Sequence, residues 1–338
     1  MELTLLVTRE KSGLDRYSWE LASRLPVRIR ETKRYLKFSE SLSLMRSLNS
    51  ARTPLHLPNQ HFGRHALHLK IPFIITVHDL ARLCYNFDPE PLGERIGLRL
   101  DKVGIRRARY IIAVSEHTKR EITRLLGIPS ERVVVIYNGV DTTVFRPRRR
   151  RYFNFPYILF VGSERPRKNL PRLLEAFVRV KAKFPSLKLV KVGTEGREPA
   201  FRKATLRKIS ELGIEKEVIF VEDVSDEELS AIYSGASALI YPSLYEGFGF
   251  PPLEAMACGC PAAVSNRTSI PEVVGDAALL FDPEDISQMA EAVERILDDE
   301  KLRDRLREEG FRRVRMFSWD RAAEETFKLY KRLCEEVS

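Results

Sequence analysis

The sequence predicts an α/β fold of two Rossmann-like, doubly wound domains, and three observations lead to this prediction. The 338 residues exceed one ordinary domain of about 100–200 residues and suit two. Short apolar runs of strand length alternate with amphipathic stretches of helical length, an order typical of parallel sheets with helical crossovers. No apolar run approaches the roughly 20 residues of a membrane-spanning helix, so we expect no span.

The first half of the chain carries four expected strands, at residues 3–7, 73–77, 110–114 and 133–136. Thr118 and Glu121 have the spacing of a capping box, which predicts that a helix begins there, after the third of these strands. We place the N-terminal domain at residues 1–145.

Between the halves lies a run of five arginines and one proline at residues 146–151. Mutually repelling charges and a proline oppose compact structure, so we expect a basic hinge at residues 146–156.

The second half repeats the alternation, with expected strands at residues 157–161, 187–192, 218–221, 238–241 and 278–281. Ser225 and Glu228 again have capping-box spacing. We place the C-terminal domain at residues 157–318 and a final helix at residues 319–338, which we expect to pack back on the N-terminal domain.

The net charge of +10 is unevenly distributed. Residues 1–145 hold 24 Lys and Arg against 15 Asp and Glu, whereas residues 152–338 hold 28 against 32. A basic N-terminal half suits an anionic partner such as a phosphorylated acceptor or an anionic membrane surface, and ordinary solvated charge is the alternative. No RNA-binding motif combines aromatic with basic residues here, so we expect no nucleic acid partner.

Metal ligands and targeting signals are not apparent in the sequence. The four cysteines and six histidines form no cluster at metal-ligand spacing, so we expect no metal and no cofactor. The apolar run after Met1 is too short for a signal peptide, and we therefore expect a cytoplasmic protein.

Residues 241–257 predict a strand, a glycine-containing loop and a helix in succession. Pro251 and Pro252 suit the first turn of that helix, whose N-terminus would offer free N–H groups and a positive dipole to an anion. Gly247 and Gly249 allow the backbone of the loop to approach a ligand closely.

Two glutamates, Glu246 in the loop and Glu254 in the helix, flank this expected anion site. An ionised carboxylate can accept hydrogen bonds from both hydroxyls of a vicinal diol. A nucleotide diphosphate-sugar has such a diol on each side of its diphosphate. A surface glutamate beside a helix-capping glutamate is the alternative interpretation.

A basic segment follows the expected strand at residues 157–161. Its side chains Arg165, Arg167 and Lys168 would reach a diphosphate at the carboxyl edge of a parallel sheet, and their charge would stabilise a departing nucleoside diphosphate. Solvated basic side chains ahead of a helix are the alternative here.

Taken together, these segments resemble glycosyltransferase family 4, whose members are retaining enzymes of two Rossmann-like domains that face each other across a cleft, the GT-B arrangement. The family's two glutamates, separated by seven residues, match Glu246 and Glu254. Further segments resemble the family in the same order, at residues 77–79, 113–116, 137–141 and 161–170. The resemblance covers almost the whole chain and implies a metal-independent hexosyltransferase.

The resemblance also implies roles for single residues. Glu246 would contact the transferred sugar, with His78 near it, and Glu254 the ribose. Arg167 and Lys168 would hold the diphosphate. The other donor-binding candidates are Gly13, Ser163, Arg165, Val224, Gly247, Phe248, Gly249 and Phe250, of which Val224 would read the base through its backbone.

Two positions depart from the family pattern. Ser163 stands where many members have an arginine, so either Arg165 or Arg167 supplies the second cation. Asp15 stands where many members have a second glycine after the one at Gly13, and its carboxylate would repel a phosphate unless it turned away.

The string at residues 246–261 resembles the mannosyltransferase-rich branch of the family, so we expect GDP-mannose as donor, with a UDP-sugar second. The expected acceptor is a hydroxyl of a glycan or a lipid-linked molecule at the inner face of the cytoplasmic membrane, where Lys33, Arg34 and Lys37 would meet anionic lipid. A sugar-nucleotide epimerase of the same architecture and a non-catalytic subunit that binds an anionic ligand are the alternatives.

Overall fold

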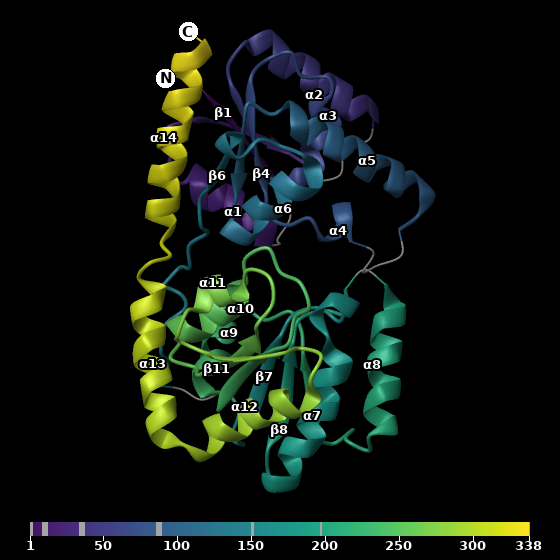
Figure 1. Cartoon of the computed structure of the whole chain (residues 1–338), viewed down its shortest axis with the longest axis vertical. Helices are drawn as coiled ribbons and strands as arrows, with labels where there is room; N and C mark the ends of the chain where they lie inside the picture. The colour runs from purple at the N-terminus through teal and green to yellow at the C-terminus, as the bar shows by residue number, and fades with distance from the viewer. Residues whose placement is uncertain are drawn as a thin grey trace. The chain divides into compact units, whose positions relative to one another are not determined.

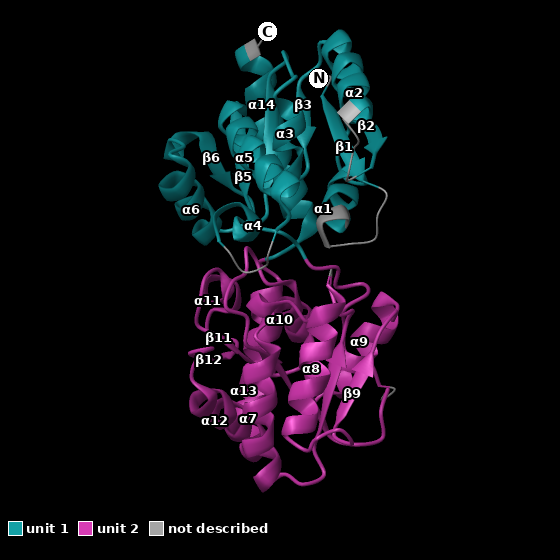
Figure 2. Cartoon of the chain, turned by 90° about the vertical axis from the view of Figure 1, so that its right-hand side faces the viewer, with its two compact units in different colours: residues 1–139, 317–338 teal, residues 140–316 magenta. Residues whose placement is uncertain are grey.

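The computed structural model describes residues 3–8, 13–33, 38–85, 90–149, 152–196 and 198–337. The chain forms two compact units: unit 1 comprises Met1–Gly139 and Phe317–Ser338, and unit 2 comprises Val140–Met316 (Figure 2). Each unit contains a six-stranded parallel sheet with helices on both faces (Figure 1). The predicted fold of two Rossmann-like domains is confirmed.

The sheet of unit 1 has the strand order β2-β1-β3-β4-β5-β6. Its strands are β1 (Thr4–Thr8), β2 (Arg28–Thr32), β3 (Leu55–Leu57), β4 (Phe73–Val77), β5 (Tyr110–Ala113) and β6 (Val133–Val135). The helical segments between them are α1 (Gly13–Ala22), α2 (Phe38–Ala51), η1 (Gln60–Phe62), α3 (Gly63–Ala66), α4 (Ala81–Cys84), α5 (Leu92–Arg107), α6 (Glu116–Leu126) and η2 (Ser130–Arg132).

The sheet of unit 2 has the order β12-β11-β10-β7-β8-β9. Its strands are β7 (Tyr157–Val161), β8 (Lys188–Val192), β9 (Val218–Val221), β10 (Ala238–Tyr241), β11 (Ala262–Ser265) and β12 (Leu279–Phe281). Its helical segments are η3 (Pro166–Lys168), α7 (Leu170–Lys183), α8 (Pro199–Glu211), α9 (Asp226–Gly235), α10 (Phe250–Ala257), α11 (Ile270–Val274), α12 (Ile286–Asp298) and α13 (Glu300–Val314).

Each unit has its own hydrophobic core. In unit 1, strand residues such as Leu6 and Ile75 pack with Phe62 and Ile105. In unit 2 a separate cluster joins the strands to α7 and α12, and Phe177 at its centre is fully buried. Apolar area removed from water stabilises each unit by about 25 cal/mol per Å².

The last helix, α14 (Trp319–Val337), belongs to unit 1 rather than to the unit that precedes it (Figures 1 and 2). Its Tyr330 is fully buried, and the hydroxyl of Tyr330 lies 2.5 Å from Nδ1 of His56 in β3. The ring of Trp319 packs edge-on against Tyr17 of α1. These contacts make α14 a part of the core of unit 1.

The compact units divide the chain after Gly139 and Met316, whereas the sequence places the first domain at residues 1–145 and the hinge at residues 146–156. The described part of the expected hinge lies in unit 2, where the N–H of Arg148 donates to Ser234 of α9 and its guanidinium donates to Ser230. Hydrogen bonds to neutral hydroxyls and carbonyls let this basic segment pack despite its charge. Arg150 and Arg151 lie outside the described residues.

Three strands were not expected from the sequence. β2 is an edge strand with four exposed residues and no apolar run. β3 has three residues and includes a histidine, and β11 consists mainly of small side chains. Strand propensity and apolar patterning are weak in all three, so pairing with neighbours decides their conformation.

One of the two capping boxes is confirmed and the other is wrong. Ser225 and Glu228 cap α9 reciprocally. At α6 the cap is Ser115, whose hydroxyl accepts from the N–H of Thr118, so the helix begins three residues before the expected position.

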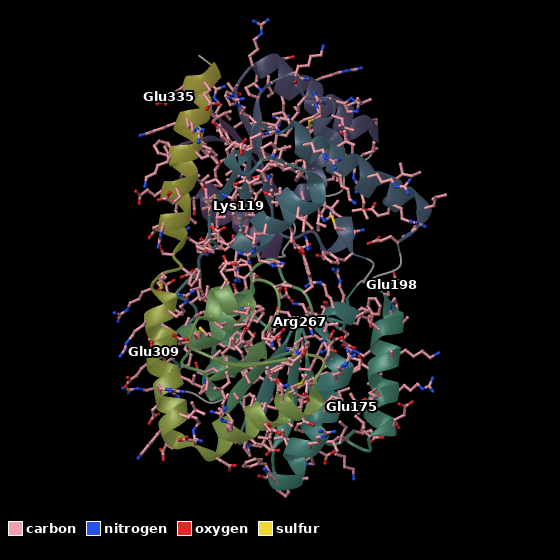
Figure 3. The ribbon with its side chains drawn as sticks, viewed as in Figure 1. Lys119, Glu175, Glu198, Arg267, Glu309 and Glu335 are labelled. Atoms are coloured by element: carbon pink, nitrogen blue, oxygen red, sulfur yellow. The ribbon has the colours of Figure 1, made fainter. Side chains whose placement is uncertain are left out.

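Charged side chains cover the outward faces of the helices, as Figure 3 shows for Glu309 of α13 and Glu335 of α14. Among the described residues, no helix combines the length and the apolar character that crossing a membrane requires.

Candidate active site

The functional candidates of unit 2 gather where its sheet reverses strand order. β7 and β10 are neighbours, and the chain proceeds from β7 to β8 on one side and from β10 to β11 on the other. Ligands of doubly wound domains bind in the crevice at the carboxyl ends of such strands. The loop after β7 carries Arg167 and Lys168, and the loop after β10 carries Glu246.

Glu246 accepts charge-assisted contacts from both basic residues. Nζ of Lys168 donates to Oε1 of Glu246 over 2.7 Å, and the guanidinium of Arg167 lies 3.1 Å from the same oxygen. Arg167 also donates to the carbonyl of Tyr245, next to Glu246 in the chain. The two loops are therefore tied together by an ion-paired cluster of one carboxylate and two cations.

Burial and charge act in opposite directions on Glu246. Burial alone would raise the pKa of its carboxyl group, but the charges of Lys168 and Arg167 outweigh burial and lower this pKa to about 2. The carboxyl group therefore stays ionised at neutral pH and is a weak base.

Lys168 lies at the centre of the cluster and is 8 % exposed. Its Nζ donates to the hydroxyl of Tyr241 over 2.6 Å and lies 4.9 Å from the centre of the Tyr241 ring. Burial lowers the pKa of Lys168 and the charge of Glu246 only partly offsets this. An anion that reached this ammonium would gain a strong, poorly screened attraction.

The backbone of the Glu246 loop is fixed by hydroxyl groups from the segment before α11. The N–H of Glu246 donates to Thr268, and the hydroxyl of Ser269 donates to the carbonyls of both Glu246 and Phe248. These bonds hold the loop in the conformation that leads into α10.

Gly249 caps α10 with φ of 107°, a conformation that favours glycine. Pro251 and Pro252 occupy the first helical turn as predicted from the sequence. The helix N-terminus thus lies directly beside the Glu246 loop, where its positive dipole suits an anion. Pro251 and Pro252 have no N–H, so the backbone donors at this end of α10 belong to the residues that lead into it.

Glu254 lies one turn into α10 and is buried, with 6 % of its surface exposed. Its Oε2 accepts a 3.0 Å hydrogen bond from the hydroxyl of Tyr233 in α9. This hydrogen bond fixes the orientation of the carboxylate. Glu246 lies in the loop before α10 and is held by Lys168 and Arg167, whereas Glu254 lies in α10 itself and is held by Tyr233.

The other candidates of unit 2 lie in loops at the same sheet edge. Ser163 and Arg165 follow β7 and are half-buried, and Val224 lies between β9 and the cap of α9. The rings of Phe248 and Phe250 pack edge to face, with Phe248 buried.

A second ionic cluster beside the first was not foreseen from the sequence. Glu164 is fully buried and accepts from Nζ of Lys191 at 3.0 Å and from Arg202 at 2.6 Å. Lys191 also donates to the carbonyl of Thr194, so the cluster joins the ends of β7 and β8 to α8. A lysine between two valines at residues 190–192 of this strand was the available sequence signal.

His78 follows β4 in unit 1 and is buried. Its Nε2 lies 2.9 Å from the carbonyl of Pro58, which fixes the tautomer that is protonated on Nε2. The ring of Tyr17 packs edge-on against the imidazole, with 4.8 Å between the ring centres. The side-chain oxygen of Gln60 accepts from the backbone N–H of His78. The imidazole is therefore held in one orientation at the carboxyl end of β4.

Several sequence candidates fall at the border of the described chain. Gly13 begins α1, whereas the side chain of Asp15 is not described. Lys33 is exposed and pairs with Glu40 at 3.0 Å. Arg34 and Lys37 lie outside the described residues.

Across the described ranges, no group of three or more His, Cys, Asp and Glu side chains is arranged to hold a metal ion.

Comparisons with known proteins match both halves of the chain. The model for glycosyl transferases group 1 matches residues 141–313, and that for glycosyltransferase family 4 matches residues 6–144. The O-antigen chain mannosyltransferase B of Escherichia coli is 32% identical over 275 residues, which span 77% of this chain and 70% of that protein. The MMP alpha-(1->4)-mannosyltransferase of Mycolicibacterium hassiacum is 33% identical over 71% of this chain and 58% of its own length.

Solved structures with the same fold cover nearly the whole chain. A sucrose-phosphate synthase from Thermosynechococcus elongatus superposes with a TM-score of 0.80 at 20% identity, over 99% of this chain and 100% of that one. Anabaena HepE, in complex with UDP and glucose, gives 0.81 at 16% identity, over 98% and 99%. These likenesses show the GT-B fold.

Proposed function

The chain belongs to glycosyltransferase family 4, and on this premise we propose that it transfers a hexose, with mannose favoured, from a nucleotide diphosphate-sugar to a hydroxyl of a glycan or lipid-linked acceptor. The observation that carries the proposal is the ion-paired cluster of Arg167, Lys168 and Glu246 beside the N-terminus of α10. It combines cations for a diphosphate with a carboxylate for sugar hydroxyls.

In this proposal the diphosphate binds Lys168 and Arg167 beside the N-terminus of α10, where the backbone N–H groups of Gly249 and Phe250 are the donors because Pro251 and Pro252 have none. When the bond from the sugar C1 to the β-phosphate oxygen breaks, negative charge accumulates on that phosphate. Fixed cations and N–H groups then stabilise the transition state more than the ground state, which raises the rate. Burial of Lys168 strengthens this effect because water screens the ammonium poorly.

Glu246 acts as a hydrogen-bond acceptor for the sugar rather than as a proton carrier. Its pKa of about 2 makes it a poor general base at neutral pH. Both cation contacts are made by Oε1, which leaves Oε2 as the oxygen for a sugar hydroxyl. Retention of configuration follows if the acceptor oxygen attacks C1 on the face that the phosphate leaves, and if its proton passes to that phosphate. No metal takes part in these steps.

Glu254 binds the ribose diol through its carboxylate, and the backbone at Val224 contacts the base. The hydrogen bond from Tyr233 holds the carboxylate of Glu254 before the nucleotide arrives, which reduces the entropy lost on binding.

The choice of GDP-mannose as first donor rests on relatives named as mannosyltransferases, among them RfbU of Salmonella typhimurium at 32% identity over 68% of this chain. A UDP-sugar is second, because HepE binds UDP and UDP-glucose in the same fold. The matched segments span 70% of the O-antigen chain mannosyltransferase B, 58% of the MMP alpha-(1->4)-mannosyltransferase and 63% of RfbU.

We assign the acceptor to unit 1, where His78 is held in a single orientation at the carboxyl end of β4. The basic N-terminal half, with 24 Lys and Arg against 15 Asp and Glu in residues 1–145, suits an acceptor at an anionic membrane surface. Co-sedimentation with anionic vesicles at low salt, absent with neutral vesicles, tests this part separately.

Calorimetry with GDP, UDP and their sugars, followed by product analysis with a hydroxyl acceptor, tests the proposed function. Tighter binding of GDP than UDP and a mannosylated product support it. Isomerised donor without any transfer would indicate an epimerase, and binding without turnover would indicate a non-catalytic subunit.

A further inference from the structure

A pocket in unit 1 lies at the amino ends of β4, β5 and β6. It has a volume of about 440 Å³ and is lined by Leu69, Lys70, Ile71, Pro72, Phe73, Arg107, Ala108, Arg109 and Arg132. Basic residues shortly precede each of these three adjacent parallel strands: Lys70 precedes β4, Arg107 and Arg109 precede β5, and Arg132 precedes β6. The topology therefore brings four cationic side chains to one sheet edge.

Two of these guanidiniums are held by backbone carbonyls rather than by acids. Arg107 donates to the carbonyl of Leu67 and, at 3.0 Å, to that of Leu69. Arg132 donates to the carbonyl of Arg106 at 2.7 Å and also to that of Ala108. Among the described residues neither side chain forms an ion pair, so no carboxylate occupies these guanidiniums while the carbonyls fix their positions.

The remaining two cations differ from each other. Arg109 pairs with Glu336 of α14 at 2.7 Å, and this glutamate also accepts from Tyr110. Lys70 is exposed, and within the described ranges its ammonium has neither an ion pair nor a hydrogen bond. Within the described ranges, Arg109 is thus the one of the four cationic side chains that pairs with a carboxylate.

The pocket also has an apolar part to its lining. Leu69 and Phe73 are buried there, with Ile71 and Pro72 half-buried between them. A lining of cationic and apolar side chains suits a ligand that has a phosphate group on a less polar body. The volume lies within the range of about 300–1,000 Å³ that is usual for small-molecule sites.

We propose that this pocket binds a phosphate or diphosphate group of a small molecule or of a lipid headgroup. The guanidiniums of Arg107 and Arg132 keep N–H groups that no described hydrogen bond uses, and these can donate to phosphate oxygens. Lys70 adds a mobile point charge at the rim. Binding at this pocket requires neither a nucleotide nor sugar transfer. Its test can therefore fail while the proposed function holds, and the reverse is also true.

The pocket is separate from the place assigned to the acceptor. Phe73 begins β4 and Val77 ends it, directly before His78. Four steps of about 3.3 Å along a strand separate the two ends by about 13 Å. A ligand in the pocket therefore lies at the opposite edge of the sheet from His78 and does not occupy an acceptor site there.

Calorimetry with inorganic pyrophosphate, and sedimentation with vesicles of phosphatidylcholine containing or lacking phosphatidic acid, test the proposal. Lys70→Glu is the main variant, because its ammonium supports no described contact and its loss should leave the fold intact. Lys203→Glu, an exposed lysine of α8 in unit 2, gives the same change of charge away from the pocket. Arg107→Gln is the second pocket variant.

We expect a phosphate-dependent binding component that Lys70→Glu weakens by roughly tenfold and Lys203→Glu leaves unchanged. If Lys70→Glu weakens the binding of pyrophosphate, the ligand is a free phosphate compound. If Lys70→Glu weakens binding to phosphatidic acid vesicles but not to pyrophosphate, the ligand is a lipid headgroup. Either result supports the site. Equal binding by wild type and all three variants in both assays would overturn it, because any anion would then be bound elsewhere, including at Lys168.

Discussion

Nζ of Lys168 and Oε1 of Glu246 lie 2.7 Å apart in a buried ion pair that joins the loops after β7 and β10. Breaking a buried pair by removal of one charge is costly because the partner is left uncompensated. The pair therefore has two roles in our proposal, since it fixes the two loops and keeps both charges ready for a donor.

Glu246→Gln should lower turnover far more than donor affinity. The amide retains the shape but loses the charge that opposes Lys168 and Arg167, and we expect kcat to fall about a hundredfold with little change in KM. Steady-state kinetics with the donor identified by calorimetry measures this. Glu175→Gln in α7, whose carboxylate pairs with Lys208 on the surface, is the control and should keep wild-type kcat. A Glu246→Gln enzyme as fast as wild type would refute the role of Glu246.

The same pair should make stability depend on pH in the acid range. The pKa of Glu246 is about 2 in the folded protein against 4.5 ordinarily, so its contribution is fully present above pH 4.5 and is lost as the pH falls towards 2. The shift of this pKa from 4.5 to about 2 corresponds to a contribution of about 3 kcal/mol to the free energy of unfolding at neutral pH. We expect the difference in unfolding free energy between wild type and Glu246→Gln to shrink over this interval, as measured by denaturant titration. A difference that stays constant from pH 6 to pH 3 would contradict the pairing.

Glu254→Ala should weaken nucleoside diphosphate binding, because the ribose loses its acceptor in both the ground and the transition state. We expect a loss of about 1–3 kcal/mol, or roughly five- to 150-fold in Kd, by calorimetry. Tyr233→Phe keeps the carboxylate but removes the hydrogen bond to its Oε2, so a smaller loss should follow. If both variants bound the nucleotide like wild type, Glu254 would have no role in ribose recognition.

Tyr330→Phe should destabilise unit 1 without affecting donor binding. The hydroxyl of Tyr330 hydrogen-bonds to Nδ1 of His56, and burial lowers the pKa of His56 to about 3, so the imidazole is neutral. Loss of this hydrogen bond to a buried group costs about 1–3 kcal/mol. Calorimetric unfolding should show the change, whereas Tyr152→Phe at an exposed position should stay within about 0.5 kcal/mol of wild type.

Much of unit 2 could be predicted because its strands are apolar and its turns are marked by proline, glycine and capping residues. β7 and β9 were placed without error, and Pro251 and Pro252 marked the start of α10. The contact of Glu246 with Lys168 could not be predicted, because 78 residues separate them and only the pairing of β7 with β10 brings them together.

The sequence was less informative where tertiary contacts decide the structure. Lys191 lies in a strand where an apolar residue is expected, and only the fold reveals that Glu164 is its counter-ion. The fold likewise shows that the arginines before β6 and β5 meet in one pocket, although their positions in the sequence were visible.

Gly249 is the N-terminal cap of α10. Its φ of 107° is rarely adopted by other residues, and a Cβ at this position would lie 2.6 Å from Cδ1 of the buried Ile270. Gly249→Ala should therefore strain the backbone by about 1–3 kcal/mol and force either Cδ1 of Ile270 or the Glu246 loop to shift, and we expect weaker donor binding.

Gly213→Ala is the matched control for this prediction. Gly213 has φ of 65° but nothing within 4 Å of an added Cβ, so alanine should cost about 1 kcal/mol of stability and leave donor binding unchanged. Ile270→Val removes the clashing Cδ1 and should partly restore donor affinity to Gly249→Ala. If the double variant bound the donor no better than Gly249→Ala, backbone strain alone would explain the loss. If Gly249→Ala bound the donor like wild type, the N-terminus of α10 would not form part of the donor site.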